Sequence, residues 1–107
     1  MPDRVRTRRQ FALFATPTAR ARSGPLSIRF VAGSDPGVAA AFAIGRPVGP
    51  AVVRNRIRRR LRALLDEMDP RPLPGKYLIK CGVGAAELTY DELNDHLRRA
   101  LGELRAR

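Results

Sequence analysis

Apolar side chains recur with helical spacing in three segments of the chain and follow strand patterns in three others. The helical pattern covers roughly residues 8–15, 50–68 and 89–105, and the strand pattern covers Leu26 to Val31, Val38 to Ile44 and Tyr77 to Cys81. Alanines make a helix the competing interpretation of Val38 to Ile44. The order α-β-β-α-β-α predicts one α+β domain with helices packed on a small sheet.

Local signals place the ends of these elements. Thr89 and Glu92 have the spacing of a capping box, in which each side chain accepts a hydrogen bond from the other residue's amide at a helix start. Three prolines within 69–75 predict an extended connector. Residues 1–6 are polar and basic, so we expect a flexible basic arm ahead of a single domain within residues 1–107.

Basic residues are concentrated in the first part of the chain. The formal net charge is +11, from 21 Lys and Arg against 10 Asp and Glu. Residues 1–62 carry 14 arginines and two acidic residues, whereas residues 63–107 carry seven basic and eight acidic residues. Such a block repels itself unless a polyanion shares its surface. Nucleic acid is the favoured partner, ahead of a membrane surface or an acidic protein.

The long helix over 50–68 has an apolar face and an arginine face. Apolar residues at helical spacing predict the buried side, which consists of Val53, Ile57, Leu61, Leu64, Leu65 and Met68. Arg56, Arg59 and Arg62 follow at steps of three on the opposite side, with Asn55 beside them. Arginines four residues apart on this helix repel each other by about a few tenths of a kcal/mol per pair. Bound phosphates would remove that repulsion, so the pattern indicates that this helix binds phosphates.

Arg54 is the exception on this helix. At about 100° per residue it falls within the apolar sector, near Ile57 and Leu65. Because Arg54 lies in the first turns, we expect its head to project past the sheet edge into a groove. This placement suggests two RNA-facing surfaces, a hypothesis that fails if Arg54 points freely into solvent.

The sequence indicates no catalytic group. A nucleophilic dyad needs His or Cys near a base, and the chain has only His96, on an acidic helix, and Cys81, in an apolar strand. Asp91, Glu92 and Asp95 lie in the first turns of the last helix, where acids favour the helix dipole, so a metal site is the weaker interpretation. No apolar run reaches the roughly 18 residues of a membrane span, and no secretory signal is recognisable. We therefore expect a cytoplasmic protein without a membrane partner.

The segment from Val48 to Arg62 resembles the signature of the bacterial ribonuclease P protein component. That signature is a Gly-x-Ala-x-x-Arg-Asn-Arg-x-(Lys/Arg)-Arg-x-x-Arg helix, and the segment Gly49 to Arg62 has this pattern. The segment from Arg8 to Phe11 is similar to the family's opening helix, and the segment from Leu88 to Leu93 is similar to the start of its last helix. Together these segments extend the resemblance over nearly the whole chain.

The resemblance implies a fold and a role. The implied fold is α-β-β-β-α-β-α around a central mixed sheet, with a left-handed βαβ crossover around the arginine helix and the additional strand within 19–23. The implied role is that of an accessory, RNA-binding subunit of a ribonucleoprotein endoribonuclease. In that enzyme the catalytic RNA removes the 5′ leader of precursor tRNA, with Mg²⁺ bound mainly by the RNA, and the protein subunit has no catalytic residues. We expect one protein monomer in the holoenzyme.

The resemblance also implies two sets of RNA-binding residues. The set that docks on the catalytic RNA is Arg46, Arg54, Asn55, Arg56, Arg58, Arg59 and Arg62. The set that lines a cleft for the single-stranded leader is Arg8, Arg9, Phe11, Arg29 and Phe30. Ala15 stands where the family usually has a second aromatic residue, one helical turn after Phe11, and Pro47 stands where it usually has a basic residue.

Two other classes of protein share parts of this pattern. A structural ribosomal protein is also small, basic and built of helices and strands, and it would bind RNA without any role in cleavage. A DNA-binding regulator would place the arginine helix in a major groove. The helix is too uniformly arginine for base readout, so the ribosomal-type protein remains the main alternative.

Overall fold

The computed structural model describes residues 3–4, 8–33 and 37–105. The strands are β1 (Asp3–Arg4), β2 (Ala19–Ser23), β3 (Leu26–Ala32), β4 (Val38–Ile44) and β5 (Gly75–Cys81). The α-helices are α1 (Arg8–Ala12), α2 (Ala51–Glu67) and α3 (Tyr90–Arg105), and the 3-10 helices are η1 (Leu13–Ala15), η2 (Arg46–Val48) and η3 (Val83–Glu87). Apart from β1 and the 3-10 turns, the order is α-β-β-β-α-β-α, which confirms the predicted fold.

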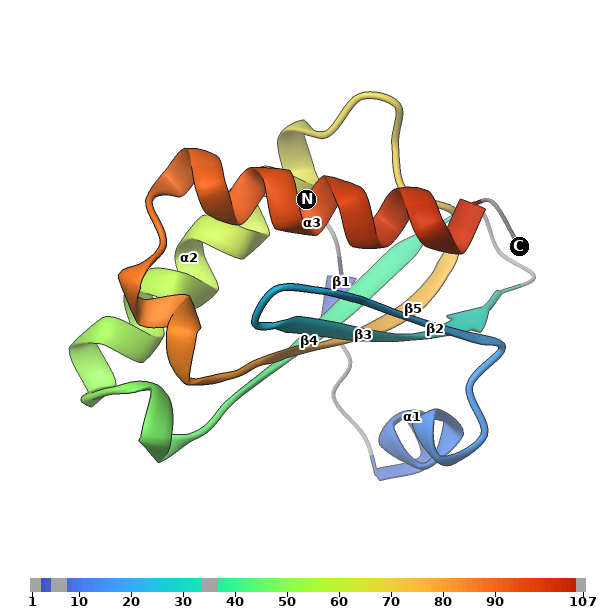
Figure 1. Cartoon of the computed structure of the whole chain (residues 1–107). Helices are drawn as coiled ribbons and strands as arrows, with labels where there is room; N and C mark the ends of the chain where they lie inside the picture. The colour runs from blue at the N-terminus through green and yellow to red at the C-terminus, as the bar shows by residue number, and fades with distance from the viewer. Residues whose placement is uncertain (1–2, 5–7, 34–36, 106–107) are drawn as a thin grey trace.

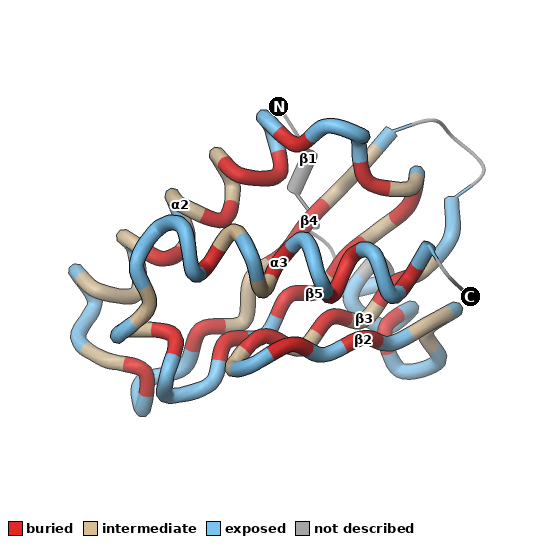
Figure 2. The backbone as a smooth tube through the Cα atoms, turned by 45° about the horizontal axis from the view of Figure 1, so that its top comes forward, coloured by how far each residue is buried: buried red, intermediate tan, exposed pale blue. Residues whose placement is uncertain are grey.

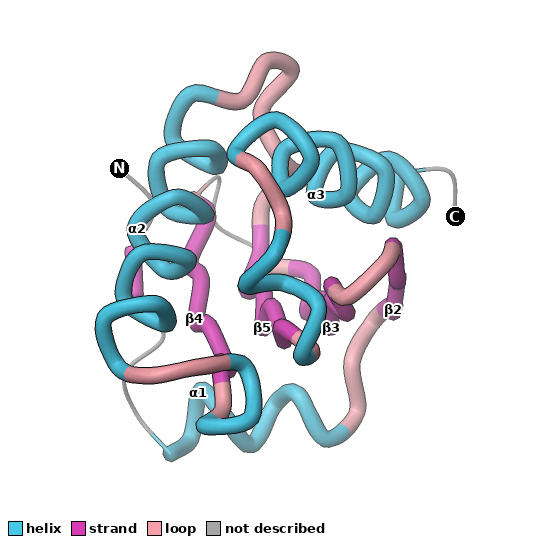
Figure 3. The backbone as a smooth tube through the Cα atoms, turned by 60° about the vertical axis from the view of Figure 1, so that its left-hand side comes forward, coloured by secondary structure: helices cyan, strands magenta, loops and turns pink. Residues whose placement is uncertain are grey.

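The strands form one mixed sheet in the order β1-β4-β5-β3-β2. β3 pairs antiparallel with β2 and β5, whereas β4 runs parallel to β5 and β1. α2 thus connects two neighbouring parallel strands, as the family resemblance implies, and the hand of this connection stays a prediction. α2 and α3 cover one face of the sheet, and α1 lies on the other (Figures 1 and 3).

The main hydrophobic core fills the space between the sheet and the pair α2 and α3. Leu26, Ile28 and Phe30 alternate along β3 and are all buried on this side. From the helices, Leu61 and Leu97 are fully buried against them. Figure 2 shows buried stretches, in red, alternating with exposed ones along α2, α3 and the strands. The core anchors α2 by one side and leaves its arginines outside.

A second, smaller core attaches α1 and η1 to the opposite face of the sheet. The Phe14 side chain is 2% exposed and packs against Ala41, with Leu78 and Val31 at the edge of the cluster. The Arg29 guanidinium donates a hydrogen bond to the Phe14 carbonyl over 3.3 Å. These contacts fix where the N-terminal helix lies relative to the strands.

Backbone chemistry sets the ends of both long helices. Pro50 is the N-cap of α2, and its carbonyl accepts hydrogen bonds from the amides of Val53 and Arg54 at 3.0 and 3.1 Å. At α3 the predicted capping box is confirmed. The Thr89 amide donates to the Glu92 carboxylate at 2.9 Å, and the Glu92 amide donates to the Thr89 hydroxyl at 3.1 Å. These bonds lower the pKa of the Glu92 carboxyl.

Two strands extend the sheet beyond the elements that periodicity predicts. β2 lies within 19–23, where the family resemblance implies a strand. β1 pairs Asp3 and Arg4 in parallel with Ala39 and Ala40. The expectation of a flexible arm over 1–6 therefore does not hold for Asp3 and Arg4, because their backbone joins the sheet edge. The other residues of that arm lie outside the described part of the chain.

Candidate nucleic-acid interface

The arginines of α2 are distributed around the whole solvent-facing half of the helix. Arg59 and Asn55 are exposed at its crest. Arg62 lies on the flank toward β4, where its guanidinium carbon stands 5.0 Å from the centre of the Phe42 ring, a cation–π contact. Arg56 lies on the other flank and reaches η3. The three residues predicted to form one stripe, Arg56, Arg59 and Arg62, thus span the solvent-facing side of α2 from one flank to the other, with Arg59 in the middle.

The flank toward β4 also carries the arginines that precede Arg62 at steps of four. Arg58 donates a hydrogen bond of 2.7 Å to the side-chain oxygen of Asn55. Arg54 is half-buried, and its Nε donates to the Gly49 carbonyl at 3.1 Å. Arg54 therefore does not point freely into solvent, and the hypothesis of two RNA-facing surfaces stays a prediction.

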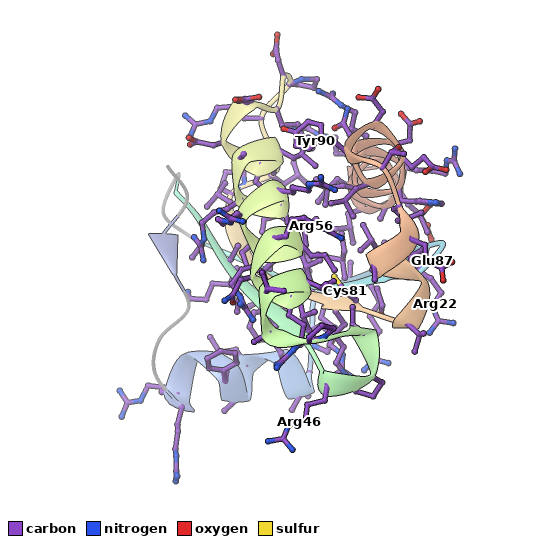
Figure 4. The ribbon with its side chains drawn as sticks, turned by 90° about the vertical axis from the view of Figure 1, so that its left-hand side faces the viewer. Arg22, Arg46, Arg56, Cys81, Glu87 and Tyr90 are labelled. Carbon is purple, nitrogen blue, oxygen red and sulfur yellow. The ribbon has the colours of Figure 1, made fainter. Side chains whose placement is uncertain are left out.

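The flank toward η3 is more enclosed. Arg56 is half-buried and its Nη2 donates to the Ala86 carbonyl over 3.4 Å. Its Nε is buried and has no hydrogen-bond partner among the described residues. Arg60 lies one turn further along this flank, where α2 faces the start of α3. Figure 4 shows Arg56 on the side of α2 that faces η3 and α3, and Arg46 projecting outward from η2.

A second basic surface lies on the sheet face away from α2 and α3. This open sheet face carries the side chains that alternate with the core residues of β2, β3 and β5. Arg20 pairs across the strands with Arg29, and Arg22 pairs with Ser27, which in turn pairs with Lys80. Like charges on directly opposed residues destabilise a sheet. A bound polyanion would remove this repulsion.

A cavity of about 710 Å³ opens at one end of the open sheet face. Arg22, Ser27, Arg29 and Lys80 contribute to its wall. At the other side of this face Phe11 is 43% exposed, and its ring meets the Phe14 ring edge-on at 6.3 Å between centroids. Basic side chains and an exposed aromatic ring on one surface are the groups that bind a single strand of nucleic acid.

The structure separates the five residues that the resemblance placed in the leader cleft. Arg8, Arg9 and Phe11 are exposed on α1, and Arg29 is half-buried on the open sheet face. Phe30 is 6% exposed and packs against the Tyr77 ring on the opposite face, with centroids 4.8 Å apart. Phe30 is therefore a core residue and we remove it from the cleft. Period-two alternation places successive residues on opposite faces, so Arg29 lies on the open sheet face and Phe30 cannot.

Three basic residues of the open sheet face and one aromatic residue were missed by sequence reasoning. Arg20, Arg22 and Lys80 lie on strands whose neighbours cannot be read from local pattern. The alternation Ala-Arg-Ala-Arg in β2 was the available signal for the first two. Tyr90, which lies beside Arg56, Arg59 and Arg60, had no local signal at all.

The two residues that could serve as nucleophile or base, Cys81 and His96, both contact other parts of the protein. Cys81 is buried, and burial raises the pKa of its thiol to about 11 against a smaller opposing effect of Arg58. His96 packs on the β2–β3 turn, with its Nδ1 2.8 Å from the Ser23 hydroxyl oxygen. Over the described ranges, no group of three or more His, Cys, Asp or Glu side chains is placed to hold a metal ion.

No helix within the described residues is long and apolar enough to cross a membrane.

Comparison with known proteins identifies the family of this chain. The family model described as Ribonuclease P matches residues 2–105. The chain belongs to the ribonuclease P protein family. One relative in this family, the ribonuclease P protein component of Acidothermus cellulolyticus, is 36% identical, and the alignment covers 97% of this chain and 91% of that protein.

Solved structures of ribonuclease P proteins share the fold. The Staphylococcus aureus protein superposes with a TM-score of 0.86 over 98% of this chain and 97% of that one, at 14% identity. The Thermotoga maritima protein gives a TM-score of 0.83 over 94% of this chain and 96% of that one, at 17% identity. At such identities the likeness establishes the fold, and the roles of individual residues must be argued from this chain.

Proposed function

We propose that this chain is the protein subunit of ribonuclease P, which assists a catalytic RNA in removing the 5′ leader from precursor tRNA in the cytoplasm. It docks on the catalytic RNA through α2 and η2 and holds the single-stranded leader on the open sheet face. It acts as a monomer in the holoenzyme and contributes binding energy, while the RNA performs the cleavage. The arginine-covered α2 is the observation that carries this proposal.

Docking relies on the guanidinium groups of Arg46, Arg54, Arg56, Arg58, Arg59 and Arg62, with Asn55 at the crest. Arginine donates to phosphate in a planar fork and remains charged at any physiological pH. Each phosphate that is neutralised releases counterions, so affinity falls steeply with salt. The contacts of Arg54, Arg56 and Arg62 with Gly49, Ala86 and Phe42 hold these side chains in defined directions before RNA arrives.

Leader binding relies on the opposite side of the molecule. Phe11 is exposed on α1 and can stack on an unpaired base without reading its identity. Arg29 and the neighbouring Arg20, Arg22 and Lys80 can follow the phosphates of the same strand. Arg8 and Arg9 extend this basic surface along α1. A substrate that keeps its leader gains these contacts, and mature tRNA lacks them.

The described residues do not form a Mg²⁺ site. Mg²⁺ prefers carboxylate oxygens and water, whereas the two proposed surfaces carry guanidinium and ammonium groups. We propose that the Mg²⁺ of the reaction is bound mainly by the RNA. The protein's positive charge lowers the repulsion between RNA and substrate, so the complex should form at a lower concentration of Mg²⁺.

The test is precursor-tRNA cleavage by a transcribed bacterial ribonuclease P RNA at limiting Mg²⁺, with and without this protein. The proposal predicts that the protein restores cleavage, and that the gain shrinks for a substrate without a leader. Arg59→Ala should weaken binding to the catalytic RNA. Arg99→Ala removes the same charge from an exposed position on α3 and should have a smaller effect. If the protein restores nothing and binds this RNA no better than ribosomal RNA, a ribosomal-type RNA-binding role replaces the proposal.

A further inference from the structure

A small pocket lies between the outer flank of α2 and the first turn of α3. Arg56, Arg59, Arg60, Ala63 and Tyr90 line it, and its volume is about 240 Å³. Three of these five residues are arginines and none is acidic. Pockets for drug-sized ligands are usually about 300–1,000 Å³, so this one suits a smaller planar group. Figure 4 shows Arg56 and Tyr90 in the strip between α2 and α3.

Tyr90 belongs to neither hydrophobic core cluster of the described residues. It is 38% exposed at the first residue of α3. Thr89 and Glu92 already satisfy the helix start by their reciprocal hydrogen bonds, and the next core residue of the helix is Leu93. Among the described residues, no aromatic ring and no guanidinium is found stacked on the Tyr90 ring. Tyr90 is thus partly exposed in the wall of an arginine pocket.

The Arg56 guanidinium is held in place by one hydrogen bond, but another of its hydrogen-bond donors has no acceptor among the described residues. Its Nη2 makes a long hydrogen bond of 3.4 Å to the Ala86 carbonyl, and its buried Nε has no partner among the described residues. A buried donor without an acceptor is uncommon in folded proteins. A phosphate oxygen at the pocket would accept from this guanidinium after a small movement of the side chain, and Arg59 and Arg60 could share its charge.

We propose that this pocket binds one unpaired nucleotide of the catalytic RNA. The base stacks on the Tyr90 ring, and the adjoining phosphate is held by Arg56, Arg59 and Arg60. A paired base is stacked on both faces within its helix, so the occupant must be extruded from a bulge, loop or strand end. The inference rests on the proposed function, because it takes the RNA that α2 binds and adds a specific contact to that docking.

The experiment measures the affinity of the full chain for a transcribed bacterial ribonuclease P RNA as a function of salt. Tyr90→Ala should weaken binding by about 5- to 150-fold, the loss expected for one base stacked on an aromatic ring. Its salt slope should equal that of the wild type, because no charge is removed. Tyr90→Phe should bind like the wild type. Val83→Ala is the matched control, since Val83 is 65% exposed and lies outside the pocket.

A second variant separates stacking from a structural effect. The chain has no tryptophan, so Tyr90→Trp introduces one fluorophore at the pocket. We expect it to retain affinity and to be quenched when the RNA is added, and we expect an RNA with the contacted nucleotide removed to abolish that quenching.

The outcomes separate this inference from the proposed function. If the wild type shows no steep salt dependence and no preference for this RNA, the proposed function and the inference fail together. If the wild type binds as proposed but Tyr90→Ala binds equally well, only the inference fails. Weaker binding of Tyr90→Ala without quenching in Tyr90→Trp also overturns it, because the loss would then be conformational.

Discussion

Replacing Phe14 by alanine should detach the N-terminal helix from the sheet and leave the rest of the fold intact. Phe14 is 2% exposed, and the other buried residue of its cluster is Ala41, which is 8% exposed. Phe-to-Ala changes in cores cost about 3–5 kcal/mol. Val31 and Leu78 at the edge of this cluster are only partly buried and can close over part of the cavity, so we expect a value near the lower limit, about 3 kcal/mol.

The loss of stability in Phe14→Ala should be confined mainly to α1 and η1. The segment is held to the sheet by Phe14 and by the hydrogen bond from Arg29 to the Phe14 carbonyl, whereas the main core belongs to other elements. A loss of about 3 kcal/mol raises the opening constant of the segment by about 150-fold. Segments with few buried contacts open without global unfolding. The amides of α1 should therefore exchange faster while those of β3 and β5 stay protected.

The assay compares hydrogen exchange, urea unfolding and two affinities for Phe14→Ala and Leu13→Ala. Leu13 is its neighbour and is 42% exposed, so its replacement should change stability by less than about 0.5 kcal/mol. Phe14→Ala should lose the part of the precursor-tRNA affinity that depends on the leader, and it should keep the affinity for the catalytic RNA. Uniform loss of protection, or leader affinity equal to that of the wild type, would refute the assignment of α1 as a separately anchored wall of the leader site.

Other parts of the structure make simpler predictions. Arg59→Ala should lower the slope of log affinity for the catalytic RNA against log salt by about 1, as measured by titration at several salt concentrations. The Cys81 thiol, with its pKa raised to about 11, should react with a disulfide reagent at pH 8 only after urea unfolds the chain, because thiolate is the reactive form. Gly24→Ala should destabilise the fold in urea titrations by more than about 1 kcal/mol, since φ is +54° and the added Cβ would lie 2.5 Å from His96. Gly102→Ala meets no atom within 4 Å in α3 and should stabilise by about 0.5–1 kcal/mol.

The elements with strong apolar periodicity could be predicted because their own residues decide them. Leu61 and Leu64 of α2 are buried as their spacing requires, and β4 has the predicted bounds despite its alanines. Residues 38–44 form a strand rather than a helix because both faces of this strand are covered by other residues. Ala40 packs in the main core, and Ala41 packs under Phe14. Small residues allow that close approach, and helix propensity is too weak to oppose it.

The open sheet face could not be predicted because it depends on which strands are neighbours. Arg20 and Arg29 are nine positions apart, and Lys80 comes from a strand beyond α2, yet register puts them on adjacent strands. β1 has no apolar pattern that would mark it in the sequence, and Asp3 and Arg4 join the sheet by pairing in parallel with Ala39 and Ala40. Phe30 is different. Its alternation with Ile28 predicts the core side, so the local pattern was a better guide than the loose family alignment.

The uneven distribution of charge along the sequence places basic and acidic residues on different elements of the fold. The arginine-rich first part of the chain builds α1, β2, β3, η2 and most of α2, and the second part, with seven basic and eight acidic residues, supplies β5 and α3. The first turns of α3 carry the exposed carboxylates of Asp91, Glu92 and Asp95 ahead of its arginines, and these would repel phosphate, so RNA bound along α2 should stop where α3 begins. Tyr90 stands at that boundary beside the last arginines of the docking surface. An RNA footprint that continued over the exposed start of α3 would contradict this account, because the carboxylates there would repel the phosphates of the RNA.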